Sequence, residues 1–168
     1  MNVRIRVETP ADVQEIAAVT TDAFLNAPHT SHTEQYIVNA LRTAGKLALS
    51  LVAEKVDTLI GHLAISPVSI SDGTTDWYGL GPVSVLSGYQ RRGIGSGLIH
   101  ESLRILRDRG ASGCVVLGEP EYYGRFGFRA QADLVLRGVP PEYFLVLSFA
   151  ESKPRGAVTY HEAFHAES

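Results

Sequence analysis

The feature that most constrains the fold of this chain is a glycine-rich segment, Gln90-Arg91-Arg92-Gly93-Ile94-Gly95-Ser96-Gly97. It follows an apolar stretch, Trp77 to Leu86, that has the character of a strand, and it precedes a helical pattern that stops at Gly110. A glycine-rich turn that opens a helix points several backbone N–H groups at one place, and the helix dipole adds partial positive charge there. Gly93 and Gly95 have no Cβ atom that would keep a phosphate from the backbone. The segment therefore predicts a strand, an anion-binding loop and a helix in succession.

The spacing of these glycines does not match the two commonest phosphate loops. The segment lacks the GK[ST] ending of a Walker loop, and GIGSG is not the GxGxxG fingerprint of dinucleotide-binding proteins. ATP and NAD are therefore weak expectations. Two interpretations remain: a phosphate site with Arg91 and Arg92 at its rim, and a tight turn that only packs a helix on a sheet.

The rest of the chain alternates between helical and extended patterns. Thr9-Pro10-Ala11-Asp12 carries the signals of a helix start, and Gly81-Pro82 favours a bulge inside the strand from 77 to 86. Helical patterns occupy about 10–24, 33–43 and the segment up to Gly110, with a further helical turn at 122–123. Extended patterns occupy 4–7, 47–54, 59–69, 77–86, 113–117, 143–149 and 157–160. No repeat or linker divides the chain, so one α/β domain over residues 1–168 is expected.

The net charge and the composition limit the kinds of molecule that the chain is expected to bind. With a formal net charge of −3 and a pI of about 6.0, the chain has no overall positive field to hold nucleic acid or an anionic membrane. No apolar run approaches the roughly 20 residues that a membrane span requires. The single cysteine, Cys114, has no intrachain partner, and the first residues lack the pattern of a secretory signal. A cytoplasmic location is expected.

Two motifs together resemble one family. The segment from Gln90 to Gly95 resembles the pyrophosphate-binding motif Q/R-x-x-G-x-G/A of the GCN5-related N-acetyltransferase (GNAT) family, with Gln90, Gly93 and Gly95 at its fixed positions. The segment from Tyr123 to Phe128 is similar to the Y-x-x-x-G-F segment that follows the fifth strand of that family. The order of elements also follows the family through nearly the whole chain. The resemblance implies an α/β (α+β) fold: a single domain with a mixed, mostly antiparallel sheet, helices on both faces and splayed central strands.

The resemblance also implies a co-substrate, acetyl-CoA, in the cleft where the fourth and fifth strands part. Its pantetheine arm would pair with the strand at Val83 and Val85, and its pyrophosphate would rest on backbone amides of the loop. The N–H group of Val83 is the candidate donor to the oxyanion. The residues that would bind the cofactor are Val83, Ser84, Val85, Gln90, Arg91, Arg92, Gly93, Ile94, Gly95 and Ser96.

In this family an amine attacks the thioester directly, which requires an acid for the departing thiolate and a base for the ammonium proton. Tyr123 matches the family's acid, because a phenol stays protonated at neutral pH; the alternative is an aromatic ring that only packs the cleft wall. The base has no clear counterpart at 78–81. Glu119, after the fifth strand, is the first candidate, and Asp76, His62 or a water chain are alternatives.

Other patterns are discounted. His161-Glu162-Ala163-Phe164-His165 fits the zinc motif H-E-x-x-H, but it follows a strand and leaves little room for a helix or a third ligand. His29 and His32 lie in a polar loop, so no metal is expected. Cys114 lies in an apolar strand and is expected to behave as a small hydrophobe, which disfavours an acyl-cysteine intermediate. Neither Ser84 nor Ser96 has a GxSxG context that would support a hydrolase.

The acceptor is not determined by the sequence. We expect a small-molecule or peptide amine, in a pocket shaped by residues 26–33, the edge at 72–77 and the tail from 151. The alternative function is a non-catalytic acyl-CoA-binding module, which would keep the glycines but would not need Tyr123. The apolar segment from Tyr143 to Phe149 leaves a homodimer open, because late strands of the family often pair between subunits.

Overall fold

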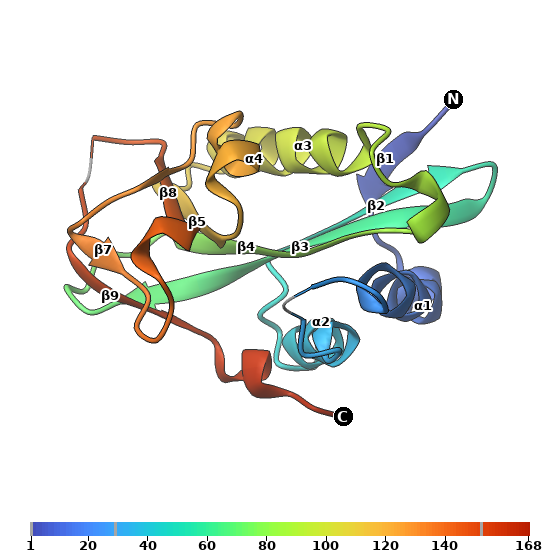
Figure 1. Cartoon of the computed structure of the whole chain (residues 1–168), viewed down its shortest axis with the longest axis horizontal. Coiled ribbons are helices and arrows are strands. Elements are labelled where there is room, and N and C mark those ends of the chain that lie inside the picture. The colour runs from blue at the N-terminus through green and yellow to red at the C-terminus, as the bar shows by residue number, and fades with distance from the viewer. Residues whose placement is uncertain (1, 29, 152) are drawn as a thin grey trace.

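A mixed sheet with helices on both faces forms the centre of the computed structural model, which describes residues 2–28, 30–151 and 153–168 (Figure 1). The strands follow the order β1-β2-β3-β4-β5-β8-β6, while β9 pairs with β3 and with β7. Every pair is antiparallel except β4–β5 and β7–β9. The strands are β1 Arg4–Val7, β2 Leu49–Lys55, β3 Thr58–Ile70, β4 Trp77–Val85, β5 Gly113–Leu117, β6 Arg129–Ala130, β7 Leu134–Val135, β8 Phe144–Ser148 and β9 Gly156–Tyr160. The predicted fold class is confirmed.

The helices form two layers (Figure 1). Helices α1 and α2 cover one face of the sheet, and the long helix α3 with the short helix α4 covers the other. The described residues also form four short 3₁₀ helices. The bounds are α1 Val13–Phe24, α2 Glu34–Thr43, α3 Ile94–Asp108, α4 Pro120–Gly124, η1 Pro10–Asp12, η2 Ser87–Tyr89, η3 Pro141–Tyr143 and η4 Glu162–His165. Among the described residues no helix combines the length and apolarity needed to cross a membrane.

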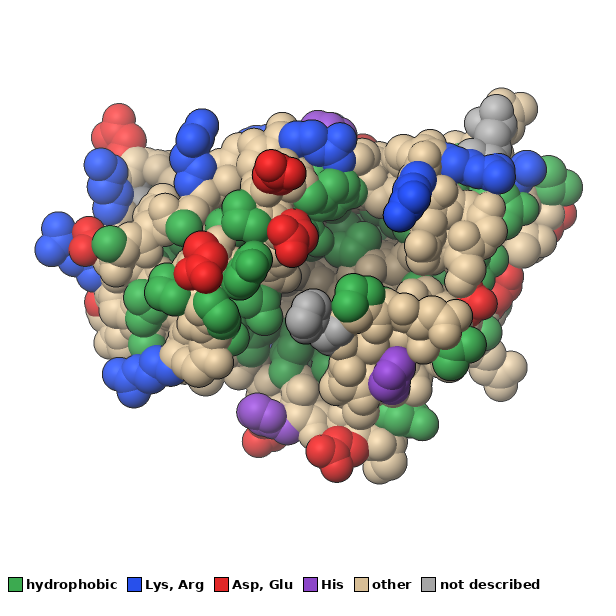
Figure 2. Space-filling model, viewed as in Figure 1, with side chains coloured by type: hydrophobic (Ala, Val, Ile, Leu, Met, Phe, Trp, Pro, Cys, Tyr) green, Lys and Arg blue, Asp and Glu red, His purple; other side chains and the backbone are tan. Residues whose placement is uncertain are grey.

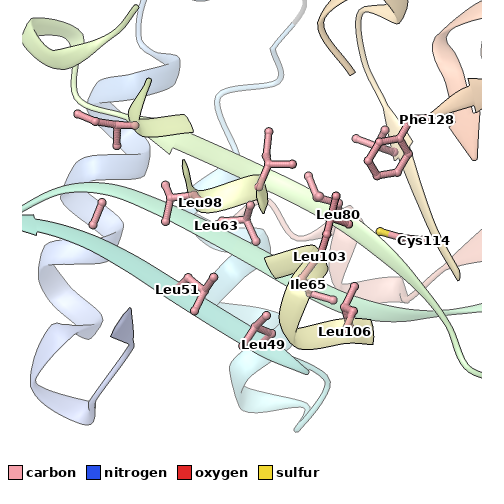
Figure 3. Close-up of a cluster of buried hydrophobic side chains, with 14 of the residues drawn as sticks. Leu49, Leu51, Leu63, Ile65, Leu80, Leu98, Leu103, Leu106, Cys114 and Phe128 are labelled. Carbon is pink, nitrogen blue, oxygen red and sulfur yellow. The ribbon is translucent and has the colours of Figure 1, made fainter. Parts of the chain in front are cut away.

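The main core lies between α3 and the sheet. Leu98 and Ile99 have no exposed surface, and Leu103 and Leu106 keep only 2% each, so these four side chains of α3 all face the sheet. Figure 3 shows leucines of α3 directed at alternate residues of β2 and β3, such as Leu63. Apolar residues that recur every 3.6 positions in the helix thus pack against apolar residues that alternate along the strands.

A second set of contacts fixes the first helical layer to the sheet. The Thr9 N–H donates to Asp12 Oδ2 at 2.7 Å, as expected for the helix start. Arg6 of β1 donates to both oxygens of Asp12, at 2.8 and 3.1 Å, and also to Glu54 of β2. The hydrogen bond from Arg6 is the largest cause that holds the pKa of Asp12 well below its usual range.

Most apolar side chains of strand β8 are buried within the chain. Phe144, Leu145 and Val146 are at most 2% exposed, because Leu145 packs in the core beneath α3 and the other two pack with Trp77 in a second core cluster. The apolar sequence at 144–146 is therefore accounted for by burial inside one subunit, whereas Tyr143 is 39% exposed.

His62 of β3 lies in a buried polar network beneath α2. Its Nε2 is 2.8 Å from Ser50 Oγ, and Ser50 Oγ in turn donates to the carboxylate of Glu8, which Arg42 holds at 2.7 and 2.9 Å. Burial is the largest cause that lowers the pKa of His62, to about 4; the charge of Glu8 opposes this and that of Arg42 adds to it. His62 is therefore neutral in the folded protein over the physiological pH range.

This network predicts a loss of stability in mild acid. The pKa of His62 is about 4 in the folded protein and about 6.5 in an unfolded chain, so the unfolded state binds the proton first as pH falls. The free energy of unfolding should have its full value above pH 6.5. It should fall by up to about 3 kcal/mol as pH approaches 4. Urea denaturation at several pH values measures this, and His62→Gln should remove the part of the slope between pH 6.5 and about 5, above the range in which the carboxylates titrate. A flat free energy across this window, or an NMR titration of the His62 ring near pH 6.5, would contradict the prediction.

Candidate active site

Strand β4 is irregular at Gly81 and Pro82. Leu63 of β3 is opposite Val83 and Ile65 is opposite Leu80, so both Gly81 and Pro82 lie opposite a single residue of β3. The bulge expected from the sequence is confirmed. Gly81 has a φ of +134°, and the Gly81–Pro82 peptide bond is cis. A bulge frees main-chain groups from the ladder and turns the strand at this point.

Strands β4 and β5 separate just before this bulge. Their parallel pairing covers only Trp77 to Gly79 on β4, and β5 turns away after that. The expected splay of the central strands is therefore present. The Leu86 N–H donates to the Ile60 C=O at 2.9 Å. In an antiparallel pair the residues that bond to the neighbouring strand alternate, so Ser84, two residues before Leu86, also directs its N–H and C=O groups at β3. The N–H and C=O groups of Val83 and Val85 consequently point to the other side, into the space left by β5.

The glycine loop lies at the end of this open edge. Arg91 and Gly93 adopt positive φ angles of 63° and 84°, and the first hydrogen bond inside α3 runs from the Gly97 N–H to the Gly93 C=O at 3.0 Å. The N–H groups of residues 94–96 therefore have no partner within the helix. Such a helix start binds anions.

A cavity of about 350 Å³, here called the loop cavity, is centred on these amides. Seven of the ten predicted cofactor residues line it: Val85, Gln90, Arg91, Gly93, Ile94, Gly95 and Ser96. Val83 lies further along the open edge of β4, as described above. The Ser84 side chain lies apart, buried on the opposite face of β4. The exposed Arg92 guanidinium lies 5.6 Å from the centroid of the Tyr89 ring, which lines the loop cavity, so Arg92 lies beside its rim.

Arg125 is a residue of the loop cavity that the sequence analysis did not single out. Its guanidinium lies 4.5 Å from the centroid of the Tyr122 ring, and both side chains line the loop cavity. The signal was present in the second motif, where Arg125 comes two residues after Tyr123. An arginine at an anion-binding helix start supplies the charge that backbone amides lack.

Tyr123 lies in α4 against the end of β5. Its ring packs on Gly118, where any side chain would collide with it, and it meets the Phe128 ring edge-on at 5.9 Å. Burial is the main cause that raises the pKa of Tyr123 to about 12, with smaller effects of Tyr122 and Cys114. Its hydroxyl makes no hydrogen bond to any residue that the structure describes. Tyr123 is therefore a protonated phenol, and its side chain packs beside the loop cavity, whose lining includes its neighbour Tyr122.

The three residues considered as bases lie in different places. Glu119 is the N-terminal capping residue of α4, with an exposed side chain and a C=O group that accepts from the Tyr123 N–H at 3.0 Å. Asp76 lies before β4, at the end where β4 and β5 are paired, and lines a separate cavity. His62 is fully buried in the network described above. Of the three, Glu119 lies nearest in sequence and structure to Tyr123.

A larger cavity of about 560 Å³, here called the bulge cavity, lies on the other side of β4. Its walls come from α1, α2, β9 and η4, and Leu80, Gly81 and Pro82 of the β4 bulge form another wall. Figure 2 shows hydrophobic side chains gathered around a hollow between the two helical layers. The bulge in β4 therefore separates an open strand edge from an apolar cavity.

Tyr160 of β9 borders the bulge cavity and has an enclosed hydroxyl. Its ring lies so close to Gly79 that a Cβ atom there would be 2.8 Å from the ring, and it meets Phe164 edge-on at 4.9 Å. The hydroxyl has no hydrogen-bond partner among the described residues, and burial raises its pKa above that of an ordinary tyrosine. Tyr160 therefore stays protonated.

The segments expected to shape an acceptor pocket contribute unequally. The tail does so, through residues 157–160, 164 and 165. The loop at 26–33 is represented only by its flanking residues, Phe24 and Glu34, and His29 lies outside the described residues. The edge at 72–77 does not line the bulge cavity: residues 73–77 line a different cavity, because β3 continues past the bulge and places this turn at the far end of β4.

The segment from His161 to His165 forms one 3₁₀ turn. His161 Nδ1 accepts a hydrogen bond from the Ala163 N–H at 3.0 Å, so that nitrogen caps the turn. Within residues 2–28, 30–151 and 153–168, no group of three or more His, Cys, Asp or Glu side chains is placed to hold a metal ion.

Comparison with known proteins defines the class of this fold and site. Residues 4–130 match the family model of the acetyltransferase (GNAT) domain. Over 168 aligned residues the chain is 36% identical to the uncharacterized N-acetyltransferase YhbS of Escherichia coli strain K12, covering 96% of this chain and 98% of that protein. The chain therefore belongs to the GNAT family of acetyltransferases.

Two solved structures are similar along their whole length. One is a GNAT family acetyltransferase from Brucella melitensis in complex with acetyl-CoA, with 47% identity, a TM-score of 0.87 and coverage of 97% of this chain and 98% of that one. The other is YhbS from Escherichia coli in complex with CoA, with 34% identity, a TM-score of 0.90 and coverage of 100% and 94%.

Proposed function

We propose that this protein transfers the acetyl group of acetyl-CoA to a primary amine by direct attack on the thioester. The observation that carries the proposal is the open edge of β4, which runs from the loop cavity to the bulge at Gly81 and Pro82. The bulge cavity adjoins this edge at the same two residues. A cofactor and an acceptor could thus meet from opposite sides of one strand. The bound acetyl-CoA and CoA of the two similar structures support this arrangement.

The length of the open edge fits the cofactor. At about 3.4 Å per residue, the stretch from Leu80 to Val85 measures about 17 Å. The pantetheine arm has about 13 bonds between phosphorus and sulfur, which is about 15 Å at the extension per bond of a polypeptide. With its pyrophosphate on the amides of residues 91–96, the arm would pair with Val83 and Val85 and bring the sulfur to the bulge.

The transfer requires balanced movements of protons and bonds. The neutral amine nitrogen bonds to the thioester carbon, the ammonium group of the resulting tetrahedral intermediate loses a proton to a base, and the intermediate expels CoA as a thiolate. The Val83 N–H would stabilise the oxyanion, and Glu119, the exposed residue at the start of α4, is the proposed base, directly or through water.

Tyr123 is the proposed acid for the thiolate. A free thiol has a pKa of about 8.5, whereas burial raises the pKa of Tyr123 to about 12, so complete proton transfer is uphill. The main contribution of Tyr123 is therefore a hydrogen bond that stabilises the thiolate as the C–S bond breaks, with the proton following from solvent or from the ammonium.

The proposal is tested by incubating the protein with acetyl-CoA and a panel of primary amines. We expect free CoA thiol and acetylated amine in equal amounts, and an unmodified protein mass with acetyl-CoA alone. The thiol is followed with a chromogenic disulfide and the amine product by mass spectrometry. Binding of acetyl-CoA without turnover of any amine would instead favour the non-catalytic acyl-CoA-binding module.

A further inference from the structure

The bulge cavity is lined mainly by apolar side chains from segments far apart in the chain. They include Phe24 of α1, Ile37 of α2, Leu80 of β4, Leu117 of β5 and Phe164 of η4. Leu117 keeps 49% of its surface exposed at the end of β5, which is unusual for a large apolar side chain of a central strand. The cavity volume of about 560 Å³ lies within the range of sites that enclose a small organic molecule.

The charged groups of the bulge cavity are few. Glu34 is the one carboxylate in its lining within the described part of the chain, and it forms no ion pair with any residue described there. Thr30 Oγ1 lies 2.8 Å from both of its carboxylate oxygens, and Ser31 Oγ lies 3.3 Å from one. These hydroxyls orient the carboxylate but leave its charge uncompensated. Arg137 and His165 lie on other walls, and both are exposed to solvent.

We infer that the acceptor is a primary amine carried on a compact apolar body, with no second charge. This inference rests on the proposed acetyl transfer and specifies the acceptor for the same site. The apolar walls would take the body of the molecule, which gains from leaving water. Glu34 would attract its ammonium form into the cavity, beside the bulge where the thioester is proposed to lie. A polyamine would need several carboxylates, whereas Glu34 is the one carboxylate among the described lining residues.

The test compares four acceptors at saturating acetyl-CoA: 2-phenylethylamine, phenylalanine, spermidine and a peptide with one lysine. We expect kcat/KM for 2-phenylethylamine to exceed that for each of the others by at least about tenfold. Phenylalanine carries the same body with an added carboxylate and so reports on Arg137. A preference for phenylalanine, spermidine or the peptide would overturn the inference.

Two variants locate the effect in the bulge cavity. Glu34→Gln should raise KM for 2-phenylethylamine about tenfold and leave the acetyl-CoA Kd unchanged, whereas Glu142→Gln, an exposed carboxylate of η3, should change neither. Leu117→Asp should lower kcat/KM for 2-phenylethylamine and raise it for spermidine. Its matched control is Val7→Asp on the edge strand β1, because Val7 is 52% exposed and lies away from this cavity.

The outcomes separate this inference from the proposed function. If spermidine or the peptide is acetylated and 2-phenylethylamine is not, the acceptor class is wrong while acetyl transfer stands. An unchanged KM in Glu34→Gln would likewise overturn the assignment of the ammonium site. If no amine releases CoA although acetyl-CoA binds, the proposed function itself fails, and the inference fails with it.

Discussion

Replacing Gly93 with glutamate is expected to weaken acetyl-CoA binding more than about 100-fold, which corresponds to about 3 kcal/mol. Gly93 precedes the free amides of α3 and lines the loop cavity, so a carboxylate there would occupy the proposed pyrophosphate site and repel it. Isothermal titration of wild type and variant with acetyl-CoA and with CoA measures the effect. Gly93 has a φ of +84°, so part of any change could come from backbone strain.

Two controls separate charge from strain. Gly73 has a nearly identical φ of +86°, equally open surroundings and a location away from the loop cavity, so Gly73→Glu should bind acetyl-CoA like wild type. Gly93→Ala introduces the strain without the charge and should lose much less affinity than Gly93→Glu. If Gly93→Glu binds acetyl-CoA normally while remaining folded, the glycine loop does not hold the pyrophosphate and only packs α3 on the sheet.

Replacing Tyr123 with phenylalanine is expected to lower kcat about 100-fold or more and to leave the acetyl-CoA Kd unchanged. The substitution keeps the ring that packs on Gly118 and Phe128 and removes only the hydroxyl, which has no hydrogen-bond partner among the described residues. The fold and the cofactor cleft should therefore persist, while the developing thiolate loses its hydrogen bond. Steady-state kinetics with the preferred amine, together with titration of acetyl-CoA, separates the two effects.

The control for this prediction is Tyr143→Phe, which removes the hydroxyl of an exposed tyrosine in η3 and should leave kcat unchanged. A Tyr123→Phe variant with wild-type kcat would contradict the assignment of Tyr123 as acid and would make its ring a wall of the cleft. A rise in the acetyl-CoA Kd with kcat preserved would instead make the hydroxyl a cofactor-binding group.

The parts of the site that the sequence predicted are those that depend on local backbone geometry. A left-handed glycine before a helix and a run of amides without partners are properties of a short segment, so Gly93 to Ser96 could be located without tertiary information. The bulge in β4 follows from Gly81 and Pro82 in the same way, because proline cannot donate to a ladder.

The parts that the sequence did not predict depend on segments far apart in the chain. The bulge cavity is lined by residues from 24–37 and from 157–165, and no local sequence pattern predicts that these two segments lie together. His62 looked available as a base because its network depends on Glu8 and Arg42, which are distant in sequence. The position of the turn at 72–77 relative to the bulge depends on the pairing register of β3 and β4, which puts this turn at the far end of β4 and which no local pattern determines.

The proposed transfer at the β4 bulge is tested most directly by a crystal structure of this protein with acetyl-CoA. We expect the pyrophosphate within about 3 Å of the N–H groups of residues 94–96 and the pantetheine arm paired with Val83 and Val85. We also expect the acetyl group at the Gly81–Pro82 bulge, facing the bulge cavity, with the sulfur within reach of the Tyr123 hydroxyl. An acetyl group directed away from that cavity, or a cofactor bound elsewhere, would contradict it.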